Sequence, residues 1–295
     1  KSEGVDYIYG QMRKILTEAP VSYIKWDMNR AFSEVFSNGN DRTYQGKVRH
    51  NYILGVYSLY ERLIQEFPDV LFESCASGGA RFDPGMLYYA PQAWTSDDTD
   101  AVERIKIQYG TSYVYPLSSM GSHVSASPNH QIFRSTSLET RGNVAYFGTF
   151  GYELDITKLT EKELEQMKEQ ITFMKQHRDL IQKGEFYRLE SPFKGNQAAW
   201  EVVAKDGSEG LMAYFRVRQP IQGKLERIYF SGLEETKAYE VRECFGEKTD
   251  FGVHYGDELM YVGFSVSDCS SGLVGVARTG QGDGYSRLFH FRKVN

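Results

Sequence analysis

The chain has 295 residues, a formal net charge of −5 and 41% hydrophobic residues. This length suits one large or two ordinary globular domains, each able to bury a core of its own. Its charges form no acidic or basic blocks, which argues against binding to nucleic acid or to anionic lipid. No apolar run approaches the roughly 18 residues that a membrane span needs. We therefore expect neither nucleic acid nor a membrane as a partner.

Three cysteines, Cys75, Cys244 and Cys269, show neither a paired framework nor CxxC spacing. This pattern is typical of reduced thiols in a cytosol and argues against a structural zinc site. We therefore predict a cytoplasmic protein without disulfides and without a bound metal.

Helical and strand-like patterns alternate over the first 180 residues or so. Helices are expected over residues 5–19, 46–67, 99–114, 135–147 and 158–182, and strands over 21–28, 70–77, 93–98 and within 115–125. Thr99 is the expected N-cap of the third helix. Such alternation indicates βαβ units and a parallel sheet.

After about residue 183 the pattern changes to short alternating strands separated by Gly, Asp and Ser turns. Extended segments are expected within 198–219, 226–233, 237–243, 257–266 and 286–295. This pattern is typical of an antiparallel β-sandwich. We therefore predict two domains, an α/β portion over 1–182 and a β-sandwich over 183–295.

The segment YIKWDMNR is the most informative one. Because side chains alternate along a strand, Lys25, Asp27 and Asn29 share one face, whereas Trp26 and Met28 point to the other. A solvent-facing edge strand would explain such a polar row. Parallel strands covered by helices are normally buried on both faces, however, so we favour a position at the C-terminal mouth of a barrel strand.

Two further segments follow expected strands. In ESCASGGARFD, Gly78 and Gly79 allow close backbone approach to a ligand and Arg81 is suited to anchoring a carboxylate, although a Gly pair is more often a plain turn. In AWTSDDTD, Asp97 stands among other aspartates, and helix capping or a calcium-like cluster are the alternatives.

Asp27 and Asp97 lie on strands separated by one other strand, so in a (β/α)₈ barrel they belong to the same layer and face each other across the mouth. Glycosidic cleavage needs such a pair, one carboxylate attacking the anomeric carbon and one carboxylic acid protonating the leaving oxygen. Retention of configuration predicts carboxyl groups about 5 to 5.5 Å apart.

The segments YIKWDMNR, SCASGGARFDPGMLYY, WTSDDTDA and KIQYGTSYVYPLSSMGSHVSASPNHQ, with the later GDELM and SRLF, resemble glycoside hydrolase family 36 α-galactosidases of bacterial type. The resemblance implies a retaining α-galactosidase that acts on melibiose, raffinose and related oligosaccharides, without a cofactor and often as an oligomer. Asp27 would be the nucleophile and Asp97 the acid/base. The implied substrate-binding residues are Lys25, Trp26, Met28, Asn29, Cys75, Gly78, Gly79 and Trp94. CASGGAR departs from the CSGGGGR of many relatives, which leaves discrimination against N-acetylgalactosamine open.

Only about five of the eight strands of a (β/α)₈ barrel are expected here, since a complete barrel needs about 250 residues. An open barrel exposes strand edges that invite pairing with another chain. We therefore expect a homo-oligomer or association with a complementary barrel half. The alternatives are a transgalactosylase of the raffinose-synthase type, which uses the same pair of carboxylates, and a non-catalytic fragment that binds or assembles.

These considerations predict little or no melibiose hydrolysis by the purified chain alone, because the early barrel strands would contribute to the sugar pocket. Galactose release, measured beside that of a full-length relative, tests this. Turnover by the purified monomer at the rate of the full-length enzyme would contradict it.

Overall fold

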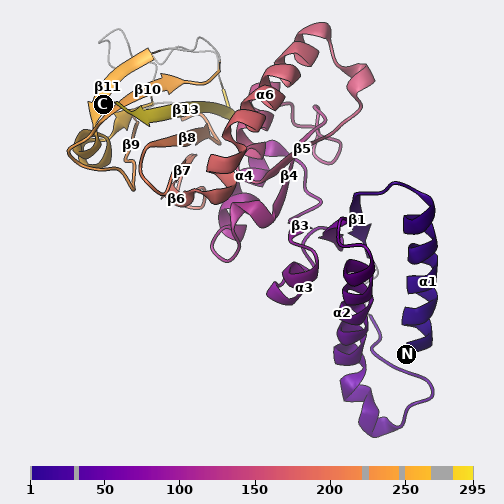
Figure 1. Ribbon diagram of the computed structural model, residues 1–295. Helices are drawn as coiled ribbons and strands as arrows, with labels where there is room; N and C mark the ends of the chain where they lie inside the picture. Colours follow the sequence, from indigo (N-terminus) through magenta and orange to yellow (C-terminus); the bar gives the residue numbers. More distant parts are fainter. Residues whose placement is uncertain (1, 30–32, 221–225, 246–249, 267–281, 295) are drawn as a thin grey trace. The chain divides into compact units, whose positions relative to one another are not determined.

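The computed structural model describes residues 2–29, 33–220, 226–245, 250–266 and 282–294 (Figure 1). Its packing divides the chain into two compact units, Lys1–Asp97 and Asp98–Asn295. Cys269 lies outside the described residues, and Cys75 and Cys244 are free thiols. The domain boundary predicted between residues 182 and 183 differs from this division and stays a prediction.

The first unit alternates helices and parallel strands. Its elements are α1 (Ser2–Glu18), β1 (Tyr23–Asp27), the 3₁₀ helix Arg42–Lys47, α2 (Val48–Glu66), β2 (Leu71–Cys75), α3 (Pro84–Tyr89) and β3 (Gln92–Trp94). β1 pairs in parallel with β2, and β2 with β3. The helices predicted at 5–19 and 46–67 are confirmed. The short α3 was not predicted; its N-cap Asp83 accepts hydrogen bonds from the backbone N–H groups of Gly85 and Met86.

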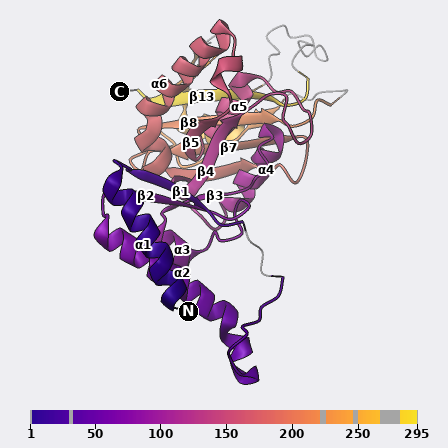
Figure 2. The same ribbon diagram turned by 90° about the vertical axis from the view of Figure 1, so that its right-hand side faces the viewer.

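Helices cover one face of this sheet (Figure 2). Apolar side chains of α1, α2, β2 and α3 form one buried cluster: Leu16, Val56, Leu59, Tyr60, Leu63, Phe72, Met86 and Ala90. Trp26 of β1 packs against it, with its ring centroid 5.0 Å from that of Tyr60 and 6.4 Å from that of Phe72. Because every second residue of a strand points to the same face, this packing directs Lys25 and Asp27 to the opposite face.

The second unit begins with further α/β structure. Its elements are α4 (Ala101–Thr111), the 3₁₀ helix Leu117–Ser119, β4 (Met120–Ser125), α5 (Leu138–Ala145), β5 (Thr149–Glu153), the 3₁₀ helix Ile156–Lys158 and α6 (Glu161–Lys183). β4 and β5 pair in parallel. No strand was predicted at the position of β5.

The N-cap of α4 is Asp100, so the prediction of Thr99 was wrong. The carboxylate of Asp100 accepts hydrogen bonds from the backbone N–H groups of Val102 and Glu103, and it also pairs with Arg134. A carboxylate can hold both the helix N-terminus and a guanidinium, whereas a hydroxyl has no charge to offer. The Thr99 hydroxyl instead accepts a hydrogen bond of 3.1 Å from the Asn129 amide.

The remainder of the second unit is antiparallel. Its elements are β6 (Glu185–Glu190), β7 (Gln197–Val203), β8 (Glu209–Arg216), β9 (Arg227–Ile228), β10 (Ala238–Glu243), β11 (Asp250–Tyr255), the π-helix Glu258–Val262, β12 (Phe264–Ser265) and β13 (Tyr285–Lys293). A six-stranded sheet has the order β11-β10-β13-β8-β7-β6, and β12 pairs with β9. The prediction of a strand over residues 257–266 was wrong for Glu258–Val262, which form the π-helix. The predicted fold class, a portion with five parallel strands followed by an antiparallel β domain, is confirmed.

Helix α5 is joined to the antiparallel sheet by buried polar contacts. The amide of Asn143 donates a hydrogen bond of 2.9 Å to the Ser286 hydroxyl of β13, which lies 3.1 Å from the Thr140 hydroxyl. Phe173 of α6 packs on Phe245, with ring centroids 5.1 Å apart. These contacts explain why α5, α6 and the antiparallel sheet belong to one compact unit.

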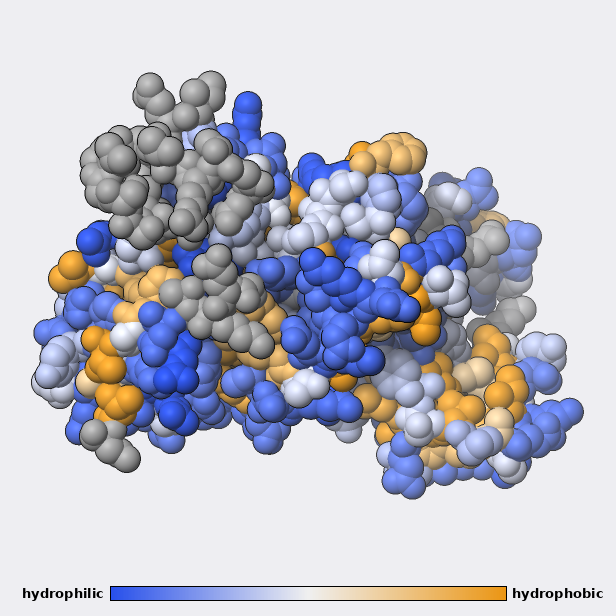
Figure 3. Space-filling model, turned by 90° about the horizontal axis from the view of Figure 1, so that it is seen from above, coloured by the Kyte–Doolittle hydropathy of each residue, from blue (hydrophilic) through white to orange (hydrophobic). Residues whose placement is uncertain are grey.

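No described helix is long and apolar enough to cross a membrane. Large apolar side chains are exposed in several elements, among them Tyr7, Tyr88, Phe193 and Tyr261. On the face drawn in Figure 3, apolar groups lie scattered among polar ones. Single exposed apolar residues of this kind are normal for a folded protein.

Glu201 of β7 is a fully buried carboxyl group. One oxygen accepts a hydrogen bond of 2.5 Å from the backbone N–H of Ser231, and the other has no hydrogen-bond partner. Burial raises the pKa of Glu201 well above its ordinary value of 4.5, and the Ser231 hydrogen bond offsets this only in part. Ionisation of this group therefore opposes folding.

We predict that Glu201→Gln raises the stability of the chain above about pH 5. Above pH 4.5 the unfolded chain loses the Glu201 proton while the folded chain retains it, so wild-type stability falls with rising pH until the folded-state pKa is passed. The neutral amide keeps an acceptor for Ser231 and removes this slope. Thermal midpoints from about pH 5 to about pH 8 would show it. The exposed Glu165→Gln is the control, and parallel pH profiles for wild type and Glu201→Gln would contradict the prediction.

Candidate active site

Polar side chains of three neighbouring strands line the uncovered face of the first unit's sheet. The parallel register places Lys25 opposite Glu73 and Asp27 opposite Cys75, and Glu73 is in turn opposite Gln92. Asp27 and Cys75 end their strands, so this row lies at the carboxyl end of the sheet. That end is where parallel α/β folds place their ligand and catalytic residues.

Asp27 is held by two hydrogen-bond donors. The side-chain amide of Asn29 donates to its carboxylate over 2.8 Å, and the thiol of Cys75 is hydrogen-bonded to the same carboxylate. Burial and the neighbouring Asp27 raise the pKa of the Cys75 thiol to about 11, although the backbone of Gly78 and the charge of Lys25 oppose this. The thiol therefore stays protonated at neutral pH and serves as a donor to Asp27.

Lys25 lies between an indole and a buried carboxylate. Its Nζ is 4.7 Å from the centroid of the Trp94 ring and 3.9 Å from Oε1 of Glu73. Glu73 is only 1% exposed, and its other oxygen accepts hydrogen bonds from Tyr23 and Gln92. These contacts hold the Lys25 ammonium group in place on the polar face of the sheet.

Sequence reasoning missed Tyr23, Glu73 and Gln92 as members of this cluster. Glu73 is the one charged residue of β2, and it pairs with Lys25 in the strand register. A charged residue inside a predicted buried strand was the available signal.

Trp26 and Met28 differ from the other predicted pocket residues. Their side chains pack on the apolar cluster beneath α1 and α2. The structure therefore brings together the side chains of Lys25, Asp27, Asn29, Cys75 and Trp94, but it does not bring those of Trp26 and Met28 to this face. The backbone of Met28 does contribute, since its N–H donates to the Cys75 carbonyl over 2.9 Å.

The loop after β2 connects Asp27 to Asp97. The side-chain oxygen of Asn29 accepts a hydrogen bond of 2.7 Å from the backbone N–H of Ser77. The next residue, Gly78, has a φ of +77° and packs so closely that a Cβ there would lie 2.6 Å from Cα of Ser96 and 2.9 Å from N of Asp97. The backbone of Asp97 therefore packs against the loop whose position Asn29 fixes by its hydrogen bond to Ser77.

Gly79 has a similar close approach, because a Cβ at this position would lie 2.8 Å from the carbonyl oxygen of Thr95. Arg81 was expected to anchor a carboxylate, but its guanidinium donates to the Met28 carbonyl and to the Tyr52 hydroxyl. Both residues therefore shape the backbone around Asp27 and Asp97.

Two polar residues of the second unit, His123 and Asn129, have local hydrogen-bond partners. His123 of β4 lies 2.9 Å through Nδ1 from a Glu153 oxygen of β5. Asn129 accepts hydrogen bonds from the N–H groups of Gln131 and Ile132, so it organises a turn. A separate group of two histidines and a glutamate, His177, Glu209 and His290, has the donor atoms for a metal ion and lies on α6 and the antiparallel sheet.

A parallel α/β portion with acidic and aromatic side chains at its strand ends is typical of barrel enzymes that act on carbohydrates. The chain belongs to the melibiase family, whose profile matches residues 1–184. Residues 197–291 match the C-terminal domain of glycosyl hydrolase family 36. The family assignment made from the sequence motifs is thus confirmed.

Two curated relatives show the degree of similarity. The chain is 52% identical over 269 residues to the α-galactosidase AgaA of Geobacillus stearothermophilus. This match covers 91% of this chain and 36% of AgaA. It is 42% identical over 298 residues to the α-galactosidase Mel36A of Lactobacillus acidophilus, covering 100% of this chain and 38% of the relative. The chain thus spans little more than a third of the length of these relatives.

Solved structures agree with the sequence matches. An AgaA variant in complex with raffinose superposes with a TM-score of 0.90 at 48% sequence identity, over 100% of this chain and 38% of that one. The galactosidase domain of an α-galactosidase–sucrose kinase, AgaSK, superposes with a TM-score of 0.87 at 37% identity, over 100% of this chain and 37% of that one.

We predict that Gly78→Ala destabilises the chain by clearly more than Gly39→Ala. Both glycines have positive φ, at +77° and +124°, so each alanine pays backbone strain of about 1–3 kcal/mol. Only Gly78 would additionally force a Cβ against the backbone of Ser96 and Asp97, because nothing lies within 4 Å of the Cβ position at Gly39. Thermal or urea denaturation of both variants measures the difference, and equal losses would show that the close approach is unimportant.

Proposed function

We propose that the chain supplies the two catalytic carboxyl groups of a retaining α-galactosidase that hydrolyses terminal α-galactosyl residues of melibiose- and raffinose-type oligosaccharides. The observation that supports this proposal is a chain of contacts between the two aspartates. Asn29 is hydrogen-bonded both to Asp27 and to the backbone of Ser77, and the next residue, Gly78, packs against the backbone of Asp97. These contacts set both acidic residues at one end of the same sheet.

The solved structures of AgaA support the substrate class. Variants of AgaA were solved with raffinose and with stachyose, each variant carrying a substituted aspartate. Those two substituted aspartates have the same separation along their chain as Asp27 and Asp97 have along this one. This agreement favours Asp27 and Asp97 as the pair that acts on the sugar.

Asp27 is the proposed nucleophile. Its oxygen forms a bond to the anomeric carbon as the bond to the leaving oxygen breaks, and the product is a galactosyl ester. The Asn29 amide and the Cys75 thiol each hydrogen-bond the carboxylate and hold its orientation. Lys25 and Trp94 flank this group, with the indole presenting an apolar surface suited to a sugar ring.

Asp97 is the proposed acid/base. It gives its proton to the leaving glycosidic oxygen in the first step, and in the second step it takes a proton from the water that attacks the galactosyl ester. Two inversions at the anomeric carbon give net retention. Gly78 and Gly79 have no side chains, so the loop lets the backbone from Thr95 to Asp97 approach closely.

We propose that Trp26 and Met28 contribute to the pocket through the backbone and through support of β1, since their side chains lie in the apolar cluster. Assembly with a second chain and residence in the cytoplasm are also proposals. The free thiols of Cys75 and Cys244 are consistent with a reducing compartment.

The roles of the two aspartates can be separated with azide in an assembly of this chain that hydrolyses α-galactosides. We predict that Asp27→Ala and Asp97→Ala each lose hydrolysis of an unactivated α-galactoside by about 10³-fold or more. With a 2,4-dinitrophenyl α-galactoside and azide, Asp27→Ala gives β-galactosyl azide by one inversion. Asp97→Ala gives α-galactosyl azide, because azide then attacks the galactosyl ester in place of water. Proton NMR of the product distinguishes the two anomers.

The matched control is Asp69→Ala, which removes an exposed carboxylate before the start of β2 and should retain hydrolysis without forming an azide product. Trapping with a 5-fluoro galactosyl fluoride, followed by peptide mapping, should label the peptide that contains Asp27. An α-azide from Asp27→Ala, or a label elsewhere, would overturn the assignment. Product analysis at high acceptor concentration separates hydrolysis from galactosyl transfer.

A further inference from the structure

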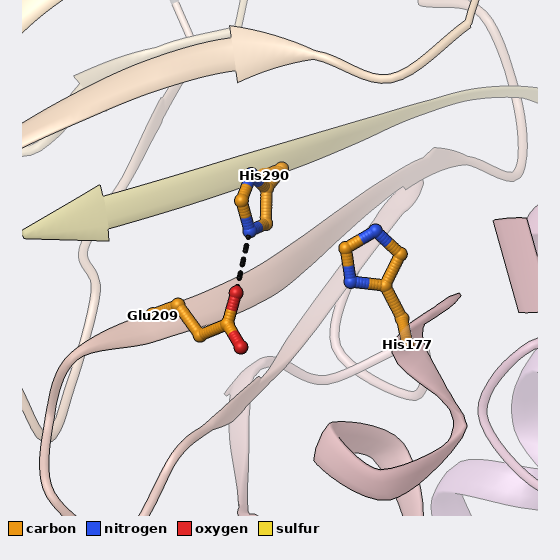
Figure 4. A group of neighbouring side chains, drawn as sticks. All are labelled: His177, Glu209 and His290. Atoms are coloured by element: carbon orange, nitrogen blue, oxygen red, sulfur yellow. Dashed lines mark hydrogen bonds and ion pairs between the residues drawn. The ribbon is translucent and has the colours of Figure 1, made fainter. Parts of the chain in front are cut away.

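His177, Glu209 and His290 form a group of donor atoms that the proposed function does not use. One side-chain donor atom from each residue lies within 4.8 Å of the other two. His177 comes from α6, Glu209 from β8 and His290 from β13, so three elements far apart in sequence converge here. Figure 4 shows the imidazole of His177 beside the hydrogen-bonded pair of Glu209 and His290.

The contacts within this group are close to those of a metal site. Nε2 of His290 lies 3.0 Å from an oxygen of Glu209, and the rings of His177 and His290 have centroids 5.1 Å apart. Ligands at about 2.0–2.2 Å around a tetrahedral zinc ion stand about 3.3 Å from one another. At 3.0 Å the pair of His290 and Glu209 is within a few tenths of an ångström of this spacing, and side-chain rotation of His177 would supply the remaining approach.

We propose that His177, Glu209 and His290 bind a divalent transition-metal ion of the Zn²⁺ type, which links α6 to the six-stranded sheet. Two imidazoles and one carboxylate are a ligand set that zinc accepts, with a fourth position left for water. Nothing in the proposed hydrolysis of galactosides requires this ion, and the role that we assign to it is to hold α6 against the sheet.

The ligand set is accessible from solvent. The side chains of Glu209 and His290 are 39% and 26% exposed, so an ion can enter from solvent. Binding through Nε2 of His290 replaces its hydrogen bond to Glu209, and any proton on that nitrogen leaves to solvent.

Neighbouring residues hold the ligands in place without competing for the ion. The Phe173 ring lies against His177, with centroids 4.4 Å apart, and limits where the imidazole can turn. Arg292 is directly opposite Glu209 in the strand register, but its side chain is exposed and can extend into solvent.

Zinc binding should be measured on the untagged chain after chelator treatment, by titration calorimetry with ZnCl₂ and by the visible absorption of a Co²⁺ complex. We expect the chain to bind one zinc ion, and we expect this binding to raise the midpoint of thermal unfolding. His177→Ala and His290→Ala should each weaken binding by about 10-fold or more and abolish the rise in midpoint. Glu209→Gln should weaken binding while preserving the side-chain size.

The matched control is His254→Ala. His254 also pairs with a glutamate, Nδ1 to Oε1 of Glu258 at 2.9 Å, but it is outside the group of three. This variant should bind zinc as wild type does. If His177→Ala fails to fold, as judged by circular dichroism, His177→Gln is used in its place. No zinc binding at millimolar concentration, or wild-type affinity in the double variant of His177 and His290, would overturn the proposal.

Discussion

The parallel register between β1 and β2 determines the chemistry of the first unit. It aligns Lys25 with Glu73 and Asp27 with Cys75 on the face that the helices leave uncovered. A slip by one residue would turn Asp27 into the apolar cluster and Trp26 out of it. The large apolar contact of Trp26 with Tyr60 and Phe72 opposes such a slip, so the core on one face fixes the polar arrangement on the other.

Polar contacts and aromatic packing join the α/β and antiparallel parts of the second unit. Asn143 reaches Ser286 of β13, and Phe173 packs on Phe245. Buried polar contacts of this kind cost free energy when one partner is missing, so they specify the position of α5 on the sheet. His177 and His290 add a further contact between the same elements, and a bound ion would strengthen a connection that packing has already made.

The sequence predicted much of this arrangement because the signals are local. The alternation in YIKWDMNR separates Lys25 and Asp27 from Trp26 by the period of a strand alone. The family motifs nevertheless placed Trp26 and Met28 in the pocket, and only packing shows that their side chains join the core. Contacts between residues far apart in the sequence determine two further features that local patterns did not predict. Asp100 rather than Thr99 caps α4 because Arg134 lies beside it, and Glu73 joins the cluster through the register.

Cys75 has a consequence for the chemical durability of the site. Thiolates, and not thiols, react with oxidants, and a group whose pKa is raised to about 11 carries very little thiolate at neutral pH. The burial that makes Cys75 a steady donor to Asp27 therefore also protects its sulfur. A more exposed thiol here would be oxidised more readily, and the added oxygen atoms would crowd the Asp27 carboxylate.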